Sequence, residues 1–496
     1  MRKALIVLVL ILLTCPRPGT AEQYRPRSFV IVGATVVDGS TRKPRVANVR
    51  VRGDRIVDVG NFKPRREEPT VDGEGLVLAP GFIDPHNHST QGLEREPGAP
   101  TQVSQGITTV VLGQDGGSPW PIADYLDARR KNRPAINVAM LVGHATVRRQ
   151  VMGDDFRRAA RADEILRTED LVERAMREGA IGLSSGLEYE VGSYATTEEL
   201  VALARVAAKH KGIYVSHIRD EADKTLDAVR EVITIAEQAG IPAQITHIKL
   251  GTVGVWGKTN EVIRMVEEAR DRGIDVTADC YPYTAWMSNL KVLVPNKQYK
   301  DAASVERGLA DVGGARNVTI ARLPSKLDYV GRSLEEIAGA EGISPVELYI
   351  RIVDDEEAAI ICHSMAEEDM RAFYQRPWVM VSSDGGIGLP HPRSAGTYPR
   401  VLGRFVREQQ WLALGEAVRK MTSAPALRFG LKDRGLIRKS MKADLVLFNP
   451  EAVIDNATFT EPFKLADGIE KVFVNGALVW NLGRATGERP GRVLPE

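Results

Sequence analysis

Short apolar runs alternate with helical patterns between about residues 130 and 285. In the stretch TTEELVALARVAAKHKG, Thr196 and Glu199 form a capping-box pattern that predicts the first turn of a helix. Apolar residues from Leu200 onward fall at helical spacing, and Gly212 marks the expected end. The run IYVSHIRD follows and predicts a strand. Because this unit repeats with short connections, the sequence predicts a parallel sheet.

Eight such strand candidates occur along the chain, which is the number that closes a (β/α)8 barrel. We therefore predict an α/β barrel over residues 81–434. The run AAIICHSM is a ninth candidate, and an insertion is expected at about residues 286–360. The eight candidates are GFIDPHNH, TTVVLGQD, INVAMLVGH, AIGLSSGLE, IYVSHIR, AQITHIK, DVTADCY and WVMVSSD.

The two ends of the chain have a different pattern from the middle. Residues 28–80 and 435–490 contain short alternating strands with glycine at the turns, such as FVIVGATVVDG and IEKVFVNGALVW. The shared pattern predicts one small β-domain to which both ends contribute.

The N-terminus carries the pattern of a secretory signal peptide over residues 1–21. Arg2 and Lys3 precede the apolar run ALIVLVLILLT, which is too short to span a bilayer comfortably. Small residues up to Ala21 provide a cleavage site, so we expect export to the periplasm or the extracellular space, with no stable membrane span after cleavage. Lipid anchoring at Cys15 is the less favoured alternative, because a threonine precedes this cysteine.

The composition changes this picture little. The chain has 496 residues, of which 43% are hydrophobic and 26% charged, as is ordinary for a globular protein. Its formal net charge is +1, so nothing in the charge balance indicates a nucleic acid or an anionic membrane surface as a partner. Beyond the signal only Cys280 and Cys362 remain, and two distant cysteines do not make a disulfide framework.

Polar residues gather at the carboxyl ends of the strand candidates, which is where barrel active sites lie. His86 and His88 are two residues apart in a strand pattern, so their imidazoles point to the same side and can share one metal ion. We interpret the whole set as a metal site at one mouth of the barrel. Its other members are Asp115, Glu188, His217, His247 and Asp384, and His144 ends the third strand candidate at the same rim.

Ten motifs extend over about residues 28–490 in a specific order and spacing. They are PGFIDPHNH, GITTVVLGQDGGS, GHATVR, GLSSGLEYEVGSYATTEEL, SHIRDE, THIK, DCYPYTA, SSDG, HPRSAGTYPRVLG and KADLVLFNP. Together they resemble the amidohydrolase superfamily and, within it, the D-aminoacylase (N-acyl-D-amino-acid deacylase) family. The resemblance implies a distorted (β/α)8 TIM barrel with a small β-sandwich formed from both termini, in agreement with the pattern above.

The resemblance also implies roles for the metal-site residues. His217 and His247 would hold a tightly bound zinc ion, and His86 and His88 would form a second, more weakly occupied position. Asp384 would be a metal ligand and the catalytic acid and base.

Five further residues match positions that contact the substrate in the family. Lys249, Tyr281 and Arg393 would grip the carboxylate of an amino acid, and Tyr189 matches a pocket residue. Ser288 is the last candidate, although the AGS of the family is replaced by AWMSN at this point.

Two other site residues have more than one interpretation. Asp115 stands in GQDG, where the family usually has a cysteine ligand in GNCG. A carboxylate is a harder ligand than a thiolate but still binds zinc, and both Asp115 and Glu188 are candidates for bridging two metal ions. His144 would assist the oxyanion that develops on the substrate, or support the site from behind.

These residues predict a secreted zinc-dependent amidohydrolase with one or two zinc ions and a small-molecule substrate. It would cleave N-acyl-D-amino acids into a D-amino acid and a carboxylate, with Asp384 moving the proton from water to the leaving amine. A dipeptidase acting on D-amino-acid or isoaspartyl peptides needs the same amide chemistry and stays an alternative.

Two other functions are disfavoured. Cyclic amidases of the hydantoinase or dihydroorotase kind use a carboxylated lysine on the fourth strand, and no lysine occurs here between Lys131 and Lys209. A non-catalytic secreted binding protein on a decayed barrel would have lost ligands, whereas the histidines and Asp384 are all present.

Overall fold

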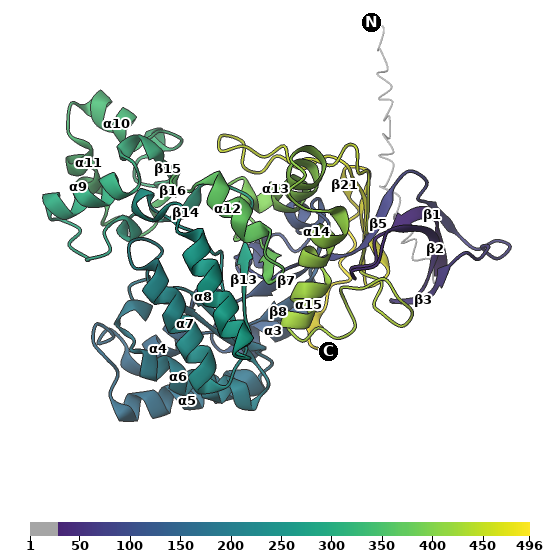
Figure 1. Ribbon diagram of the computed structural model, residues 1–496, viewed down its shortest axis with the longest axis horizontal. Helices are drawn as coiled ribbons and strands as arrows, with labels where there is room; N and C mark the ends of the chain where they lie inside the picture. The colour runs from purple at the N-terminus through teal and green to yellow at the C-terminus, as the bar shows by residue number, and fades with distance from the viewer. Residues whose placement is uncertain (1–27) are drawn as a thin grey trace, which may run out of the picture.

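The computed structural model describes residues 28–496, so the predicted signal peptide and Cys15 lie outside the described residues. Each of the eight predicted segments contains a parallel strand, and together these strands form the centre of the molecule (Figure 1). Their bounds are β6 (Phe82–Asp84), β7 (Ile107–Leu112), β8 (Asn137–Met140) with β9 (Val142–Gly143), β10 (Gly182–Gly186), β11 (Ile213–His217), β12 (Ala243–Ile245), β13 (Val276–Cys280) and β17 (Val379–Val381).

Hydrogen bonds join these strands into a ring. One parallel sheet has the order β17-β13-β12-β11-β10-β9, and another has the order β8-β7-β6, with the short β22 (Val493–Leu494) beside β8. β8 and β9 are two parts of one strand, interrupted only at Leu141. Between β6 and β17, Asn87 and Gly385 form a parallel bridge, and the His88 N–H donates to the Gly385 carbonyl at 2.8 Å. The predicted eight-stranded barrel is therefore present.

Amphipathic helices cover the outside of the barrel. In α6, the Thr196 side chain accepts a hydrogen bond from the Glu199 N–H, and residues such as Leu200 and Leu203 bury one face. No helix within the described range, residues 28–496, is long and apolar enough to cross a membrane. The main covering helices are α3 (Ile122–Lys131), α4 (His144–Met152), α5 (Ala162–Arg177), α6 (Thr197–Lys209), α7 (Thr225–Ala239), α8 (Thr259–Asp271), α12 (Glu367–Tyr374), α13 (Arg393–Arg400), α14 (Leu414–Met421) and α15 (Ser423–Arg428).

Both ends of the chain build a single nine-stranded sheet, which we call the composite sheet. Its order is β21-β20-β19-β18-β5-β1-β2-β3, with β4 beside β1, so the two ends meet where β5 pairs with β18. The ring of Phe29 on β1 stacks on that of Phe473 on β19 at 4.9 Å, which shows that the sheet curls around its own core. The bounds are β1 (Ser28–Val36), β2 (Arg45–Arg52), β3 (Arg55–Gly60), β4 (Thr70–Asp72), β5 (Val77–Pro80), β18 (Leu445–Phe448), β19 (Ile469–Val474), β20 (Ala477–Asn481) and β21 (Arg484–Ala485).

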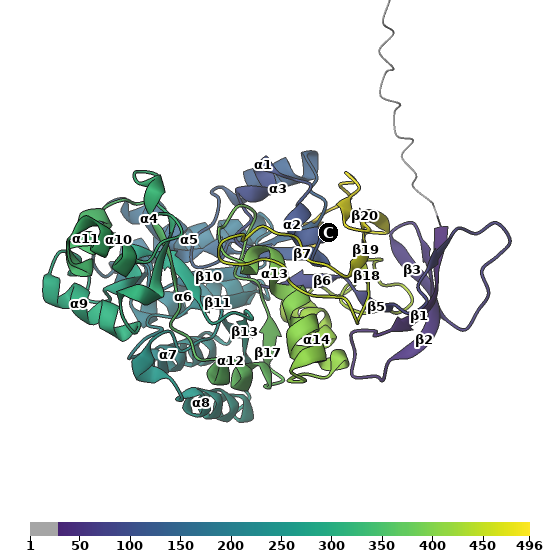
Figure 2. The same ribbon diagram turned by 90° about the horizontal axis from the view of Figure 1, so that it is seen from above.

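The insertion begins at β14 and ends with β16, and it has a hydrophobic core of its own. The ninth strand candidate, AAIICHSM, supplies β16, which pairs with β14 and β15 in an antiparallel sheet apart from the barrel. Figures 1 and 2 show the insertion and the composite sheet at opposite ends of the molecule, with the barrel between them. The bounds are β14 (Trp286–Asn289), β15 (Val318–Arg322), β16 (Ala359–Cys362), α9 (Ala302–Asp311), α10 (Leu334–Glu341) and α11 (Pro345–Ile352).

Candidate metal centre

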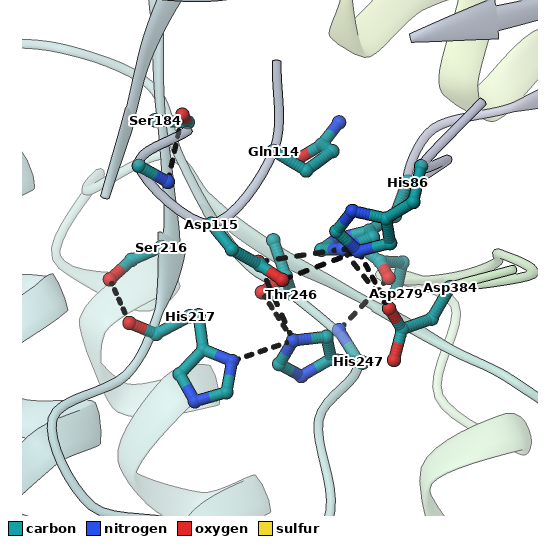
Figure 3. Close-up of polar contacts among 12 residues, drawn as sticks. His86, Gln114, Asp115, Ser184, Ser216, His217, Thr246, His247, Asp279 and Asp384 are labelled. Atoms are coloured by element: carbon teal, nitrogen blue, oxygen red, sulfur yellow. Dashed lines mark hydrogen bonds and ion pairs between the residues drawn. The ribbon is translucent and has the colours of Figure 1, made fainter. Parts of the chain in front are cut away.

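His86 and His88 follow β6 and lie beside Asp384, which follows β17. The Nε2 atoms of the two histidines are 3.1 Å apart, and Asp384 Oδ1 lies 3.3 Å from His86 Nε2 and 3.1 Å from His88 Nε2. Asp84 helps to fix this arrangement, because its carboxylate accepts the Ser383 N–H at 2.9 Å. The first and last strands of the ring thus deliver three predicted ligands to one point, where Figure 3 shows His86 facing Asp384.

Asp115, which follows β7, lies between two pairs of histidines. Its Oδ1 is 3.4 Å from His86 Nε2 and 3.6 Å from His247 Nε2 (Figure 3), and its Oδ2 is 3.3 Å from His88 Nε2. His217 completes the second pair, because its Nδ1 lies 3.0 Å from His247 Nε2. One carboxylate therefore lies close to histidines of both predicted metal positions.

The other ring nitrogens of His217 and His247 each face a glutamate. Glu188 Oε2 lies 2.9 Å from His217 Nε2, and Glu221 Oε1 lies 3.0 Å from His247 Nδ1. A carboxylate on one ring nitrogen fixes the tautomer and leaves the lone pair of the other nitrogen for a metal ion. Glu188, predicted as a ligand, is thus placed on the nitrogen of His217 that does not face His247.

Three residues of the centre have backbone conformations that residues other than glycine rarely adopt. The angle φ is 54° at Asp115, 34° at His247 and 47° at Asp384, all in the left-handed region. Asp279 holds one of them in place, since its Oδ1 accepts the His247 N–H at 2.9 Å. Strained backbone of this kind is typical of functional sites, where surrounding bonds keep a side chain in a required direction.

The donor atoms suit a divalent metal ion. Imidazole nitrogens and carboxylate oxygens are ligands that zinc takes in proteins. Asp115 Oδ1 is buried without a hydrogen-bond donor, and a cation would satisfy it. Two groups have ligand atoms within 4.8 Å of one another: His86, Asp115, His247 and Asp384 form the first, and His217, Glu221 and His247 form the second.

Electrostatics keep two carboxylates of the centre deprotonated. Burial raises the pKa of Asp384, but the Arg393 guanidinium and three nearby imidazoles outweigh burial and hold the pKa well below its usual value. The pKa of Asp115 is likewise well below its usual value, because His86 and the other imidazoles outweigh burial. Glu188 differs, since burial raises its pKa more than the contact with His217 lowers it. Asp384 and Asp115 therefore face the histidines as anions.

A cavity of about 300 Å³ opens beside these side chains. Its walls come from the barrel rim and from the insertion, so the insertion shapes the space next to the centre. Four of the five predicted substrate residues line it, namely Tyr189, Lys249, Ser288 and Arg393. The fifth, Tyr281, supports the wall from behind, with its ring centre 4.7 Å from the Arg393 guanidinium.

Two cations connect the cavity wall to the metal centre. Arg393 Nη1 lies 2.8 Å from Asp384 Oδ2. Lys249 Nζ lies 2.6 Å from Glu221 Oε1 and 2.9 Å from His247 Nδ1. Each cation is therefore held by a carboxylate that also contacts an imidazole of the centre.

His144 is not brought to the cavity. It begins α4, and its Nε2 lies 3.0 Å from Glu199 Oε1, while Arg148 donates to the same oxygen at 2.5 Å. The three side chains are fully buried, and none of them lines the cavity. His144 follows β9, but α4 directs its imidazole toward Glu199 on α6, so this placement does not support a role at the reacting carbonyl.

Three carboxylates of the centre were missed by the sequence analysis. Asp84, Glu221 and Asp279 contact, respectively, the backbone beside Asp384, the side chain of His247 and the backbone of His247. Asp84 and Glu221 stand inside the quoted motifs PGFIDPHNH and SHIRDE, so the available signal was a carboxylate within four residues of a predicted ligand.

The sequence model of the amidohydrolase family matches residues 69–480, which is most of the chain. The chain belongs to the amidohydrolase family. Among curated relatives, this amidohydrolase is 37% identical to the D-aminoacylase of Alcaligenes xylosoxydans xylosoxydans, over 95% of this chain and 98% of the relative. It is 36% identical to the N-acyl-D-glutamate deacylase of the same organism, over 94% of this chain and 96% of the relative.

A solved structure has the same fold as this amidohydrolase. The N-acyl-D-glutamate deacylase from Bordetella bronchiseptica, complexed with zinc and a phosphonate inhibitor, matches with a TM-score of 0.86 at 34% identity, over 94% of this chain and 99% of that chain. The predicted fold class is therefore confirmed, and the amidohydrolase is a hydrolase that acts on linear amide bonds.

Proposed function

We propose that the protein is an exported, zinc-dependent N-acyl-D-amino-acid deacylase that releases a D-amino acid and a carboxylate. The observation that carries this proposal is the convergence of four histidines, Asp115 and Asp384 at a cavity whose wall presents Arg393. The full-length similarity to D-aminoacylase and to two relatives named as N-acyl-D-glutamate and N-acyl-D-aspartate deacylases supports the substrate class.

The imidazoles and carboxylates supply enough ligands for one or two zinc ions. His217 Nδ1, His247 Nε2 and Asp115 would hold the tighter position, and His86 and His88 would hold the second. Asp115 would contact both, because it lies close to His86 and His88 of one position and to His247 of the other. When bound, zinc polarises a carbonyl and lowers the pKa of water to about 7.

In this proposal Asp384 moves the proton. Its carboxylate is ionised and lies at the cavity wall beside His88, so it can accept a proton from the attacking water and give it to the leaving amide nitrogen. Arg393 holds the second oxygen of Asp384 at 2.8 Å, which leaves Oδ1 as the oxygen that faces the imidazoles.

The substrate carboxylate would bind at the end of the cavity lined by Arg393 and Lys249, where Tyr281 supports Arg393 from behind. A guanidinium binds a carboxylate in a fixed plane, so this contact would decide which face of the α-carbon meets the centre. The ring of Tyr281 lies against Arg393 and restricts its orientation. Tyr189, whose ring centre is 4.5 Å from that of His217, closes the wall near the metal position.

A cyclic amidase with a bridging carboxylated lysine is disfavoured by the fourth barrel strand. This strand, β10, has the sequence GLSSG and carries no lysine. The side chains that reach the two metal positions are carboxylates and imidazoles instead, among them Asp115.

The experiment that tests the proposal is an assay of purified, zinc-loaded protein against paired N-acetyl-D- and N-acetyl-L-amino acids. We expect release of free amino acid from the D-forms only. Hydrolysis of L-forms alone, or activity on cyclic amides but not on linear ones, would contradict it.

Export rests on the sequence of residues 1–21 and has its own test. Expression of the full chain followed by fractionation and N-terminal sequencing should give a protein outside the cytoplasm that begins after Ala21. An uncleaved chain in the cytoplasmic fraction would contradict export and leave the deacylase activity untouched.

A further inference from the structure

At His247 Nδ1, a hydrogen-bond donor, Lys249, and an acceptor, Glu221, compete for the same imidazole nitrogen. Lys249 Nζ lies 2.9 Å from His247 Nδ1, and Glu221 Oε1 lies 3.0 Å from the same nitrogen. The ammonium can only donate and the carboxylate can only accept, so these two contacts require opposite protonation states of Nδ1. Glu221 Oε1 also accepts from Lys249 Nζ at 2.6 Å.

The outcome of this competition decides whether His247 can bind a metal ion. If Nδ1 accepts from Lys249, the neutral ring carries its proton on Nε2, and Nε2 is the atom that faces His217 and Asp115. If Nδ1 donates to Glu221, the lone pair of Nε2 is free. Lys249 then donates to Glu221 and to the His247 carbonyl, which is 3.3 Å away.

We propose that Glu221 is a positioning residue that draws Lys249 away from His247 Nδ1 and thereby keeps His247 in its metal-binding tautomer. The side chain is suited to this task because it is buried, and its loop is anchored where the Gly251 N–H donates to the Glu221 carbonyl at 2.9 Å. Lys249 can therefore lie next to His247 and bind the substrate without preventing His247 Nε2 from binding the metal ion. The inference rests on the proposed metal-dependent function.

A double-mutant cycle of E221A and K249M tests the inference, with zinc affinity measured by competition with a chromophoric chelator. Loss of an outer carboxylate partner typically weakens metal binding about 10- to 100-fold, and we expect this for E221A. K249M alone should change zinc affinity little. In the E221A background, K249M should recover most of the loss, because no ammonium then forces the proton onto Nε2.

Two results would overturn the inference. One is zinc binding by E221A at wild-type affinity, and the other is an equal effect of K249M in both backgrounds, since that would reflect only removal of a positive charge near the metal. E231A is the matched control, because Glu231 pairs with Arg219 and contacts no imidazole. Wild-type protein that binds no zinc would instead contradict the proposed function.

A second measurement covers the case in which E221A folds poorly. In the metal-free protein with ¹⁵N-labelled histidine, the wild-type His247 resonance should report a protonated Nδ1, and E221Q should shift the proton toward Nε2. The H247N variant assigns the resonance. An unchanged tautomer in folded E221Q would also contradict the inference.

Discussion

Two buried histidine clusters lie at the rim of the same barrel, and they differ in how their donors and acceptors are matched. In the cluster of His144, Glu199 and Arg148, the carboxylate has a donor on each side, and Arg148 also donates to the carbonyl of Arg158 at 2.5 Å. In the metal centre, nitrogen faces nitrogen, as between His86 and His88 at 3.1 Å.

The difference shows that a histidine after a barrel strand indicates a metal site only when the groups around its imidazole are known as well. The carboxylate of the His144 cluster, which we call the saturated cluster, needs no added cation, because a guanidinium and an imidazole already face it. The buried atoms of the cluster that lack a hydrogen-bond partner, His144 Nδ1 and Arg148 Nε, are nitrogens and not carboxylate oxygens. In a cluster with facing lone pairs and an unpartnered carboxylate oxygen, as on Asp115, a divalent ion supplies the missing positive charge. His144 and His86 have the same sequence signal and opposite surroundings.

The largest effect is expected from D384N. The amide cannot accept the proton of the attacking water, so kcat should fall by about 10²- to 10⁴-fold while the tightly held zinc stays. Steady-state kinetics and metal analysis on the same preparation check this. E199Q is the matched control from the saturated cluster and should retain turnover. Near-native turnover of D384N would contradict the assignment of Asp384 as the general base.

The second-largest effect is expected from removal of the metal, which should affect the metal centre and leave the cluster of His144 unchanged. A ligand at 100 to 1,000 times its Kd stabilises the folded state by about 3–4 kcal/mol, so a chelator should lower the unfolding temperature and abolish activity, and zinc should restore both. The H144Q variant should show the same chelator-induced shift as the wild type, because its cluster holds no metal. Equal unfolding curves with and without chelator would contradict a metal at this centre.

H144Q itself should act on stability alone. Replacing His144 leaves the buried Glu199 with one hydrogen-bond partner fewer, at a cost of about 1–3 kcal/mol in the free energy of unfolding. Chemical denaturation should show this loss, with kcat/KM unchanged. A large fall in kcat at native stability would show that His144 takes part in catalysis, and it would contradict the proposed difference between the two clusters.

The smallest effect is expected at Glu164, which pairs with Arg158 at the edge of the saturated cluster. The hydrogen bonds from Arg158 outweigh burial and lower the pKa of Glu164 to about 2. Since the folded-state pKa is depressed, the stabilisation is complete above the unfolded pKa of about 4.3 and is lost as the pH falls toward 2. E164Q should thus be less stable than the wild type by about 1 kcal/mol at pH 7, and denaturant curves should converge in acid. A gap that widens in acid would contradict this.

Much of the fold was predictable because its signals are local. All eight barrel segments were identified, since a buried parallel strand is a short apolar run and each one ends in a polar group. The insertion, which runs from β14 to β16, interrupts the repeat, and its own fold was not predicted. The single curled sheet depends on the pairing of Leu78 with Leu447, which no local pattern reveals.

The sequence predicted which residues gather at the candidate site, but not how their side chains are oriented. The carboxyl ends of parallel strands meet at one rim, so His86, His217 and Asp384 could be grouped from the chain alone. The direction of each side chain depends on longer-range contacts, such as the bond from the His247 N–H to Asp279. The direction of His144 toward Glu199 and the contact of Glu221 with His247 could not be predicted for this reason.

The pairing of β5 with β18 has a consequence for how the chain is made. β5 is complete at Pro80, but its partner begins only at Leu445. At a synthesis rate of 5–20 residues per second, the wait between them is about 20–70 s, and a bare strand edge attracts other chains during that time. The residues of the barrel are therefore synthesised before β18 is available to pair with β5. Chaperones that shield the edge of β5 should raise the yield of soluble protein.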